Sequence, residues 1–142
     1  MQKQLKDLTA KGYIEEVTSP YGSGILFVPK AGGKMRMVVD YRPINKLTVV
    51  DKYPLPRIDE MLDRVGDAAY FSKLDLHSGF HQIRVHPDHN ERTAFRTKYG
   101  TFAYRVMPFG LCNAPATFQK TMDYIFQNMR QLCGAYIDDI LV

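Results

Sequence analysis

Cysteine is scarce in this sequence, tryptophan is absent, and no long apolar run occurs. The two cysteines, Cys112 and Cys133, belong to no CxxC pair, so a disulfide framework and a thiolate zinc site are both disfavoured, and a reducing compartment is favoured. No window approaches about 18 apolar residues, and the polar stretch of residues 1–12 is not a secretory signal. We therefore expect an intracellular protein without a membrane span.

Two common site motifs are also missing. The sequence has no HExxH, and Gly79 separates His77 from His81, so these histidines are not expected on one helical face. The Gly33-Lys34 pair lacks the spaced first glycine and the Ser or Thr of a phosphate-binding loop. A zinc site and a phosphate-binding loop of this kind are both disfavoured.

What is present indicates one globular domain. The chain has 142 residues, of which 45% are apolar and 24% charged, an ordinary balance for a folded protein. It ends in the apolar run 136–142 with no cap, turn or polar tail after it. A natural domain seldom stops inside its apolar pattern, so we expect a fragment.

The basic excess is concentrated in one segment. The formal net charge is +4, and residues 29–46 alone carry five basic side chains against one acidic one: Lys30, Lys34, Arg36, Arg42 and Lys46 against Asp40. Such a patch attracts phosphates or nucleic acid. The alternative is a solvated strand edge with protective lysines.

Apolar periodicity and turn residues predict an α+β fold in which helices pack on an antiparallel sheet. The predicted helices cover residues 2–11, 57–65 and 114–130, the last capped by Asn113. Two hairpins are predicted, one from strands 25–28 and 35–41 and the other from strands 93–97 and 101–106. Further strands are predicted at 70–76, at 82–85 and in the C-terminal run. Residues 42–56, which contain three prolines, are predicted to be irregular. The expected packing faces are Ile58, Met61, Leu62 and Val65 on one helix and Phe118, Met122, Ile125 and Met129 on another.

Three aspartates stand in apolar surroundings. Asp75 is the only acidic residue of its strand, and Asp138 and Asp139 lie between Ile137 and Ile140. Carboxylates in such strands lose hydration unless a cation meets them. The alternative is a two-residue hairpin turn at Asp138-Asp139. The two interpretations are compatible, because three carboxylates converge if Asp75 ends a neighbouring strand, and they would then hold two divalent cations roughly 3.5–4 Å apart.

Several segments in order resemble the motifs of reverse transcriptases. They are Val38-Val-Asp-Tyr-Arg-Pro-Ile-Asn-Lys46, Phe71-Ser-Lys-Leu-Asp-Leu-His-Ser-Gly-Phe-His-Gln82, Thr93-Ala-Phe95, Val106-Met-Pro-Phe-Gly-Leu111, Asn113-Ala-Pro-Ala-Thr-Phe-Gln119 and Tyr136-Ile-Asp-Asp139. The Met-Pro-Phe-Gly-Leu form is similar to the gypsy-type branch of long-terminal-repeat retrotransposons. The resemblance runs from about Leu5 to the last residue.

The resemblance implies a catalytic role for the three aspartates. Asp75, Asp138 and Asp139 would bind two Mg²⁺ ions, for which Mn²⁺ may substitute, and the backbone carbonyl of Leu76 would help to hold one of them. Asp139 would be the less direct ligand. The implied reaction is the templated addition of deoxynucleotides to a primer 3′-hydroxyl.

The resemblance also implies a nucleotide site. Lys30 and Arg36 would bind the β- and γ-phosphates. Phe80 would exclude a ribose 2′-hydroxyl, although without the resemblance a core aromatic is the preferred interpretation of this residue. Phe109 matches a position that faces the incoming nucleotide, where retroviral enzymes often have Gln, so a packing role is favoured there.

The implied partners are an RNA or DNA template with its primer and deoxynucleoside triphosphates, and no membrane. Asp40 and Arg42 would lie near the template and Tyr136 near the primer end. The remainder of a Pol polyprotein, with its thumb, connection and RNase H, is a further expected partner. The implied location is the cytoplasm or virus-like particles.

The implied organisation is one partial polymerase domain over residues 1–142, truncated before the thumb. The fingers would cover about 1–50 and 83–110, and the incomplete palm about 51–82 and 111–142. The isolated chain is then expected to be weak or inactive. Two alternatives stay open: a non-catalytic nucleic-acid-binding remnant of a decayed retroelement, and a plain structural fragment.

Overall fold

A computed structural model describes residues 1–29, 32–33, 35–66 and 68–142 of the chain. The chain divides into two compact units, one formed by residues 1–49 and 80–112 and the other by residues 50–79 and 113–142. The sequence predicts boundaries between fingers and palm after about residues 50, 82 and 110. Whether the two units act as fingers and palm stays a prediction.

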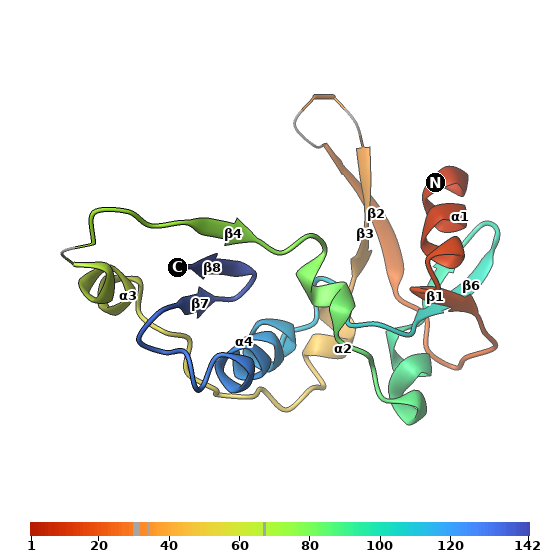
Figure 1. Ribbon diagram of the computed structural model, residues 1–142. Coiled ribbons are helices and arrows are strands. Elements are labelled where there is room, and N and C mark those ends of the chain that lie inside the picture. Colours follow the sequence, from red (N-terminus) through yellow and green to blue (C-terminus); the bar gives the residue numbers. More distant parts are fainter. Residues whose placement is uncertain (30–31, 34, 67) are drawn as a thin grey trace. The chain divides into compact units, whose positions relative to one another are not determined.

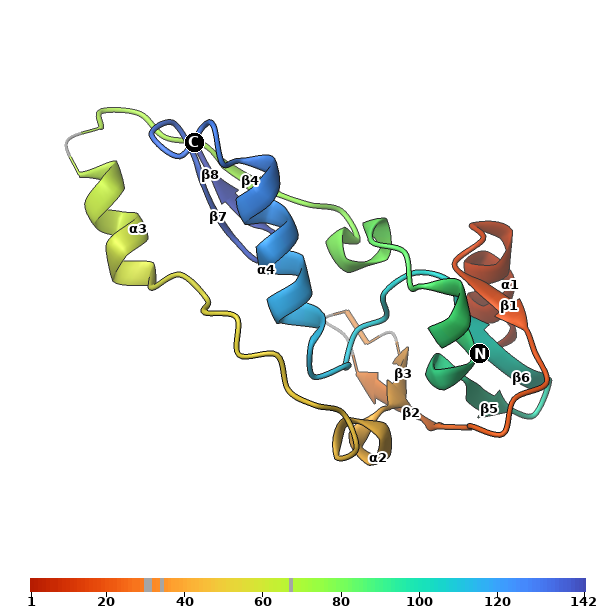
Figure 2. The same cartoon turned by 90° about the horizontal axis from the view of Figure 1, so that it is seen from below.

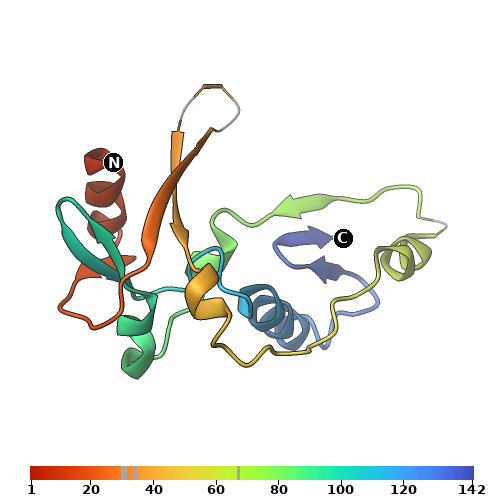
Figure 3. The ribbon, with the colours of Figure 1, turned by 180° about the vertical axis from the view of Figure 1, so that it is seen from behind.

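The first unit holds two small antiparallel sheets (Figure 1). Its elements are α1 (Gln2–Ala10), β1 (Ile14–Glu16), β2 (Gly24–Pro29), β3 (Met35–Asp40), α2 (Arg42–Asn45), η2 (Pro87–Thr93), β5 (Phe95–Thr97) and β6 (Gly100–Tyr104), with η1 (Gly79–Gln82) at its boundary. The strands run in the orders β1-β6-β5 and β2-β3. Seen from behind in Figure 3, β2 and β3 form a two-stranded ribbon, as their predicted hairpin requires.

A cluster of buried apolar side chains holds the first unit together. Its members come from α1, from strands of both sheets and from the adjoining loops: Leu5, Ile14, Val39, Tyr41, Phe95, Tyr104 and Val106. The Tyr41 hydroxyl donates a hydrogen bond of 2.8 Å to the carbonyl of Thr93, which satisfies the one polar atom of this buried ring. Burial raises the pKa of Tyr41 far above its ordinary value.

Three predictions for the first unit need correction. Residues 42–45, predicted irregular, form α2, because Pro43 is compatible with the first turn of a helix. Strand β1, which was not predicted, pairs with β6 through Ile14 and Tyr104. Gln82, predicted as extended, ends the short helix η1, and pairing with the segment around Val106 begins only after it.

The second unit is a three-stranded sheet with a helix on one face. Its elements are α3 (Ile58–Val65), β4 (Lys73–Asp75), α4 (Ala114–Ile125), β7 (Gly134–Tyr136) and β8 (Asp139–Leu141). The strand order is β4-β8-β7, all antiparallel. Figure 2 shows α4 lying across the face of β7 and β8, where Phe118, Met122, Ala135 and Ile140 are buried.

The second unit differs from its prediction in its helix ends and faces. Helix α4 stops at Ile125 instead of continuing to residue 130, and no described side chain of α4 after Met122 is buried, so packing no longer favours a helix there. Ile125 and Met129, expected on the packing face, are exposed. Asn113 is the N-cap residue of α4, as predicted, but its side chain makes no capping hydrogen bond; its Oδ1 accepts a hydrogen bond of 2.9 Å from the backbone N–H of Asp51.

Strand β4 is also shorter than the predicted strand 70–76. Tyr70 and Phe71 are exposed, and Ser72 exchanges two backbone hydrogen bonds with Val142 just before β4 begins. The side chains of Leu62 and Val65, expected on the packing face of α3, lie outside the described residues.

The predicted α+β class is confirmed, although the strands form three small sheets instead of one. Within the described residues, no helix has the length and apolar character needed to cross a membrane.

Candidate active site

The three aspartates lie at one end of the β4-β8-β7 sheet. Asp75 ends β4 and is paired directly with Asp139, the first residue of β8. The backbone N–H of Leu76 donates a hydrogen bond of 3.0 Å to the carbonyl of Asp138, which extends the pairing beyond the strands. Opposed residues of an antiparallel pair project from the same face, so the carboxylates of Asp75 and Asp139 share a face of the sheet. Asp75 therefore ends a strand that neighbours the hairpin, which is the condition that the sequence analysis set for the carboxylates to converge.

The hairpin turn is shifted by one residue from the predicted one. Tyr136 pairs with Asp139, so the two central residues are Ile137 and Asp138 rather than Asp138 and Asp139. Ile137 has a φ of 55°, a left-handed conformation that is unfavourable for a β-branched residue. This register puts Asp139 on the strand opposite Asp75 and leaves Asp138 alone in the turn. Strain of this kind persists only where neighbouring contacts hold it.

Gln119 supplies those contacts from α4. This side chain is fully buried. Its Oε1 accepts a hydrogen bond of 2.8 Å from the backbone N–H of Ile137, and its Nε2 donates to the carbonyl of Ala135 at 2.9 Å. Nε2 also donates a hydrogen bond of 2.9 Å to Oδ1 of Asp123. The side-chain amide of Gln119 therefore joins α4 to strand β7 and to the turn that contains Asp138.

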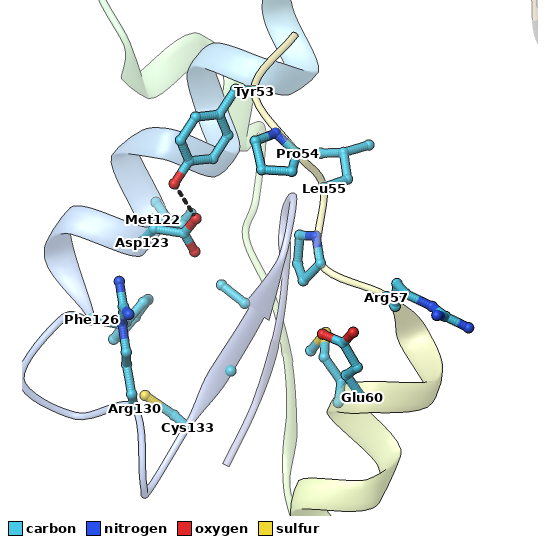
Figure 4. Close-up of a pocket in the computed structure, with 14 residues that line it drawn as sticks. Tyr53, Pro54, Leu55, Arg57, Glu60, Met122, Asp123, Phe126, Arg130 and Cys133 are labelled. Carbon is cyan, nitrogen blue, oxygen red and sulfur yellow. Dashed lines mark hydrogen bonds between the residues drawn. The ribbon is translucent and has the colours of Figure 1, made fainter.

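The same network continues to the segment that precedes α3. The hydroxyl of Tyr53 donates a hydrogen bond of 2.6 Å to Oδ2 of Asp123 (Figure 4), and this bond raises the pKa of Tyr53. The two residues line a cavity of about 500 Å³ between residues 53–61 and the elements α4 and β7. Tyr53, Asp123 and Gln119 thus form a continuous hydrogen-bonded path to the hairpin.

Lys73 is a cation that pairs with one of these carboxylates. Its Nζ lies 3.0 Å from Oδ2 of Asp139. Its pKa is raised, first by this hydrogen bond and the charge of Asp139, and further by the charges of Asp75 and Asp138. All three aspartates therefore act on one ammonium group. The sequence analysis did not single out Lys73, although its place two residues before Asp75 on one strand puts both on the same face.

The donor chemistry of this site fits a magnesium ion. Carboxylate oxygens and a backbone carbonyl are the hard ligands that Mg²⁺ prefers. Among the described residues, however, no three such side chains are already gathered around one point. The carbonyl of Leu76 accepts a hydrogen bond of 3.2 Å from the N–H of Gly79 and keeps a second lone pair.

The expected nucleotide-binding residues belong to the first unit. Phe80 is buried, and its ring centroid lies 4.9 Å from that of Phe109, whose side chain is half exposed. Arg36 is an exposed residue of β3 and lines a second cavity, of about 310 Å³, together with Phe109. Lys30 lies outside the described residues. The burial of Phe80 agrees with the core-aromatic alternative as well as with a nucleotide contact.

Asp40 and Arg42 bind each other. Nε of Arg42 donates to Oδ1 of Asp40 at 2.8 Å and Nη2 donates to Oδ2 at 2.7 Å, while the backbone N–H of Arg42 donates to Oδ1 at 3.1 Å. Hydrogen bonds from the side chain and then the backbone of Arg42 lower the pKa of Asp40 to about 2. Part of the positive charge that the sequence assigns to residues 29–46 is therefore neutralised locally.

The structure sorts the predicted site residues into two groups. Asp75, Leu76, Tyr136, Asp138 and Asp139 lie together on the sheet of the second unit. Arg36, Asp40, Arg42, Phe80 and Phe109 belong to the first unit. Gln119 was missed as a candidate, although its position between Phe118 and Met122 puts a polar amide on the apolar face of a helix, and that pattern is a usable signal.

Solved structures with a similar fold include reverse transcriptases. A foamy viral protease-reverse transcriptase in complex with double-stranded DNA superposes with a TM-score of 0.89 at 30% identity, over 99% of this chain and 29% of that one. The same enzyme in complex with an RNA/DNA hybrid also gives 0.89, at 28% identity, over 99% of this chain and 19% of the other. The fold of the chain is therefore that of part of a reverse transcriptase.

Sequence comparison gives the family. Residues 28–142 match the family described as reverse transcriptase (RNA-dependent DNA polymerase), and the chain belongs to it. The Pol polyprotein of transposon 297 from Drosophila melanogaster is 42% identical over an alignment of 148 positions, which covers 100% of this chain and 14% of the polyprotein. An RNA-directed DNA polymerase homolog of Oenothera berteroana is 43% identical over 109 residues, 76% of this chain and 77% of that protein. The chain thus spans a small part of the Pol polyproteins that it matches. Members of this family generally depend on a divalent metal.

Proposed function

We propose that this chain carries the catalytic carboxylates of an RNA-directed DNA polymerase of a gypsy-type retrotransposon. In the reaction, a primer 3′-oxygen forms a bond to the α-phosphorus of a deoxynucleoside triphosphate, and the bond to the departing pyrophosphate breaks. The observation that carries the proposal is the register that sets Asp75 opposite Asp139, with Asp138 in the adjoining turn. The similarity to reverse transcriptases that were solved with nucleic acid supports it.

The aspartates would hold two Mg²⁺ ions, or Mn²⁺ in their place, with the carbonyl of Leu76 as an additional ligand. Bound metal would supply activation of the 3′-hydroxyl and neutralisation of the triphosphate. Gln119 keeps the turn of Asp138 in its register, so it acts as a positioning residue. Lys73 holds the carboxylate of Asp139 and would have to release it when that oxygen becomes a ligand.

The first unit would supply the nucleotide contacts. Arg36 and Lys30 would bind the β- and γ-phosphates, since a guanidinium donates two parallel hydrogen bonds to such oxygens. Phe80 would lie against the sugar and disfavour a 2′-hydroxyl, and Phe109 would support the ring of Phe80, which it contacts. In this proposal the first unit acts as fingers and the second as palm.

Template and primer would be RNA or DNA. Arg42, oriented by Asp40, would lie near the template, and Tyr136, the partner of Asp139 across the hairpin, near the primer end. The thumb, connection and RNase H of a Pol polyprotein are the proposed further partners. For the chain alone we expect weak, non-processive synthesis.

Single-nucleotide incorporation tests the proposal. The purified chain, in excess over a labelled primer on an RNA template, is expected to add the complementary deoxynucleotide when Mg²⁺ is present. Asp138→Asn should abolish this addition and leave template binding nearly intact, whereas Asp59→Asn, at an exposed carboxylate of the same unit, should change neither. Addition that ignores the template base, or that survives Asp138→Asn, would overturn the proposal.

A non-catalytic nucleic-acid-binding module is the second candidate. The ion pair between Lys73 and Asp139 favours it, because a tethered ammonium already neutralises a carboxylate that a metal would otherwise bind. Template binding with no incorporation at all, by a chain extended with the thumb of its Pol polyprotein, would decide for this candidate.

A further inference from the structure

An open groove in the first unit is lined by cations that the polymerase reaction does not use. It has a volume of about 820 Å³, and its lining includes Lys11, Arg84, Arg105, His86 and Asn90. We call it the cationic groove. Its lining residues come from residues 11–13 after α1, from residues 81–90 and from residues 105–106 after β6.

Backbone hydrogen bonds fix the base of the cationic groove. The N–H of Arg105 donates to the carbonyl of Tyr13 at 2.9 Å, and the N–H of Val85 donates to the carbonyl of Arg105 at 3.0 Å. Arg84 is bridged to Val106 in the antiparallel sense. Three separate stretches of the chain therefore hold the basic side chains in a defined arrangement.

The positive charge of the groove is only weakly compensated. None of the described residues that line it is Asp or Glu. Lys11 forms an ion pair of 3.0 Å with Asp7, a residue that does not line the groove. Nε of Arg105 lies 3.8 Å from Oε2 of Glu15, and both of these side chains are exposed. Within the described part of the chain, Arg84 has no ion pair. Exposed pairs of this kind contribute little, so the groove keeps a positive potential that attracts a polyanion.

The groove also contains unsatisfied hydrogen-bonding atoms. Among the described residues, three buried side-chain polar atoms have no hydrogen-bond partner, and two of them, Nδ1 of His81 and Oδ1 of Asn90, belong to residues that line the groove. Burial, and then the positive charge of Lys11, lowers the pKa of His81. Both atoms are buried, so the groups that the groove offers to a ligand at its surface are its cations.

We propose that the cationic groove binds a single-stranded segment of nucleic acid, with Arg84, Arg105 and Lys11 contacting its phosphates. Arginine suits this role through its bidentate geometry. The partly buried ring of Tyr13, which also lines the groove, adds an aromatic surface of the kind on which unpaired bases stack. The inference rests on the proposed function, because the template strand of a polymerase is a single-stranded nucleic acid. It involves none of the residues assigned to catalysis.

Fluorescence anisotropy with a labelled oligonucleotide of about 15 nucleotides tests the groove. The double variant Arg84→Gln/Arg105→Gln is expected to bind about tenfold more weakly, and its plot of log affinity against log salt should be shallower by about 1.4, which is two phosphate contacts on a single strand. Lys3→Gln/Arg92→Gln removes the same charge from exposed positions of the same unit that do not line the groove. This control should lose no more than about twofold.

Two further arms make the outcome decisive. Arg84→Lys/Arg105→Lys keeps the charge and should keep most of the binding, while far-ultraviolet circular dichroism checks that each variant is folded. Equal losses in the two Gln variants, or competition by polyglutamate as effective as that by single-stranded DNA, would overturn the proposal. Asp138→Asn should bind the oligonucleotide as the wild type does. Failure of catalysis therefore shows in the incorporation assay alone, and failure of the groove in the binding assay alone.

Discussion

Oε1 of Gln119 accepts a hydrogen bond of 2.8 Å from the backbone N–H of Ile137, the residue that adopts a left-handed conformation beside Asp138. The turn has a positive φ at its first central residue only, a pattern that usually requires glycine there. Isoleucine can occupy this position because the buried amide of Gln119 holds the peptide group between Tyr136 and Ile137. The geometry of the aspartate hairpin is thus set from α4 and not by the turn sequence itself.

Gln119→Leu is expected to destabilise the chain by about 2–4 kcal/mol, because the N–H of Ile137 and the carbonyl of Ala135 lose a buried partner. Urea unfolding followed by tyrosine fluorescence measures the change. Gln127→Leu, at an exposed glutamine just after α4, is the matched control and should change the free energy of unfolding by less than about 0.5 kcal/mol. Equal stabilities of the two variants would show that Gln119 does not hold the hairpin.

The limits of prediction from sequence are visible at this hairpin. Apolar alternation and the two aspartates were enough to predict a hairpin next to the strand of Asp75. They were not enough to choose its register, because Asp tolerates a turn better than Ile, and the sequence-based turn was therefore placed one residue too late. The contacts that reverse this preference come from Gln119, whose backbone partners lie 16 and 18 residues away. Such long-range backbone contacts have no local sequence signal.

Asp40 is expected to titrate about two pH units below an ordinary carboxylate, with a pKa of about 2, because of its hydrogen bonds with Arg42. Since the folded-state pKa is lowered, the pair stabilises the fold above the ordinary value of 3.8, and this contribution is lost as the pH falls from about 4 to about 2. Carbon-13 NMR of the carboxyl group measures the titration. Arg42→Gln should return it to near 3.8, and Arg36→Gln on the same strand should not. An unshifted titration in the wild type would refute the ion pair.

Alkaline conditions are expected to destabilise the first unit. Burial raises the pKa of Tyr41 far above 10.0 and that of Tyr104 to about 12. As the pH rises from 10 toward 12, the unfolded chain has released phenolic protons that the folded chain keeps, so the free energy of unfolding falls by about 1.4 kcal/mol per pH unit for each ring. Urea unfolding between about pH 8 and 11.5 measures this slope. Tyr41→Phe should reduce it, and Tyr124→Phe, at an exposed ring, should leave it unchanged.

Phe80→Val is expected to admit ribonucleotides if its ring lies against the sugar of the incoming nucleotide. The comparison is single-nucleotide incorporation of a ribonucleotide against the matching deoxynucleotide, and their ratio is the readout. Phe109→Val removes the ring that packs on Phe80 at 4.9 Å and controls for loosened packing alone. An unchanged sugar preference in Phe80→Val, with the fold intact by circular dichroism, would assign Phe80 to the core.

Lys73→Gln is expected to strengthen divalent-metal binding at the aspartates by about two- to fivefold, because an exposed ammonium that competes for the carboxylate of Asp139 is removed. Titration with Mn²⁺, followed by electron paramagnetic resonance of the free ion, measures binding without any need for activity. Arg57→Gln removes an equal charge that pairs with Asp59 instead and should not alter the affinity. Weaker binding in Lys73→Gln would show that the lysine orders Asp139 for the metal and does not compete with it. Loss of the enhancement in Lys73→Gln/Asp139→Asn would place the effect at that carboxylate.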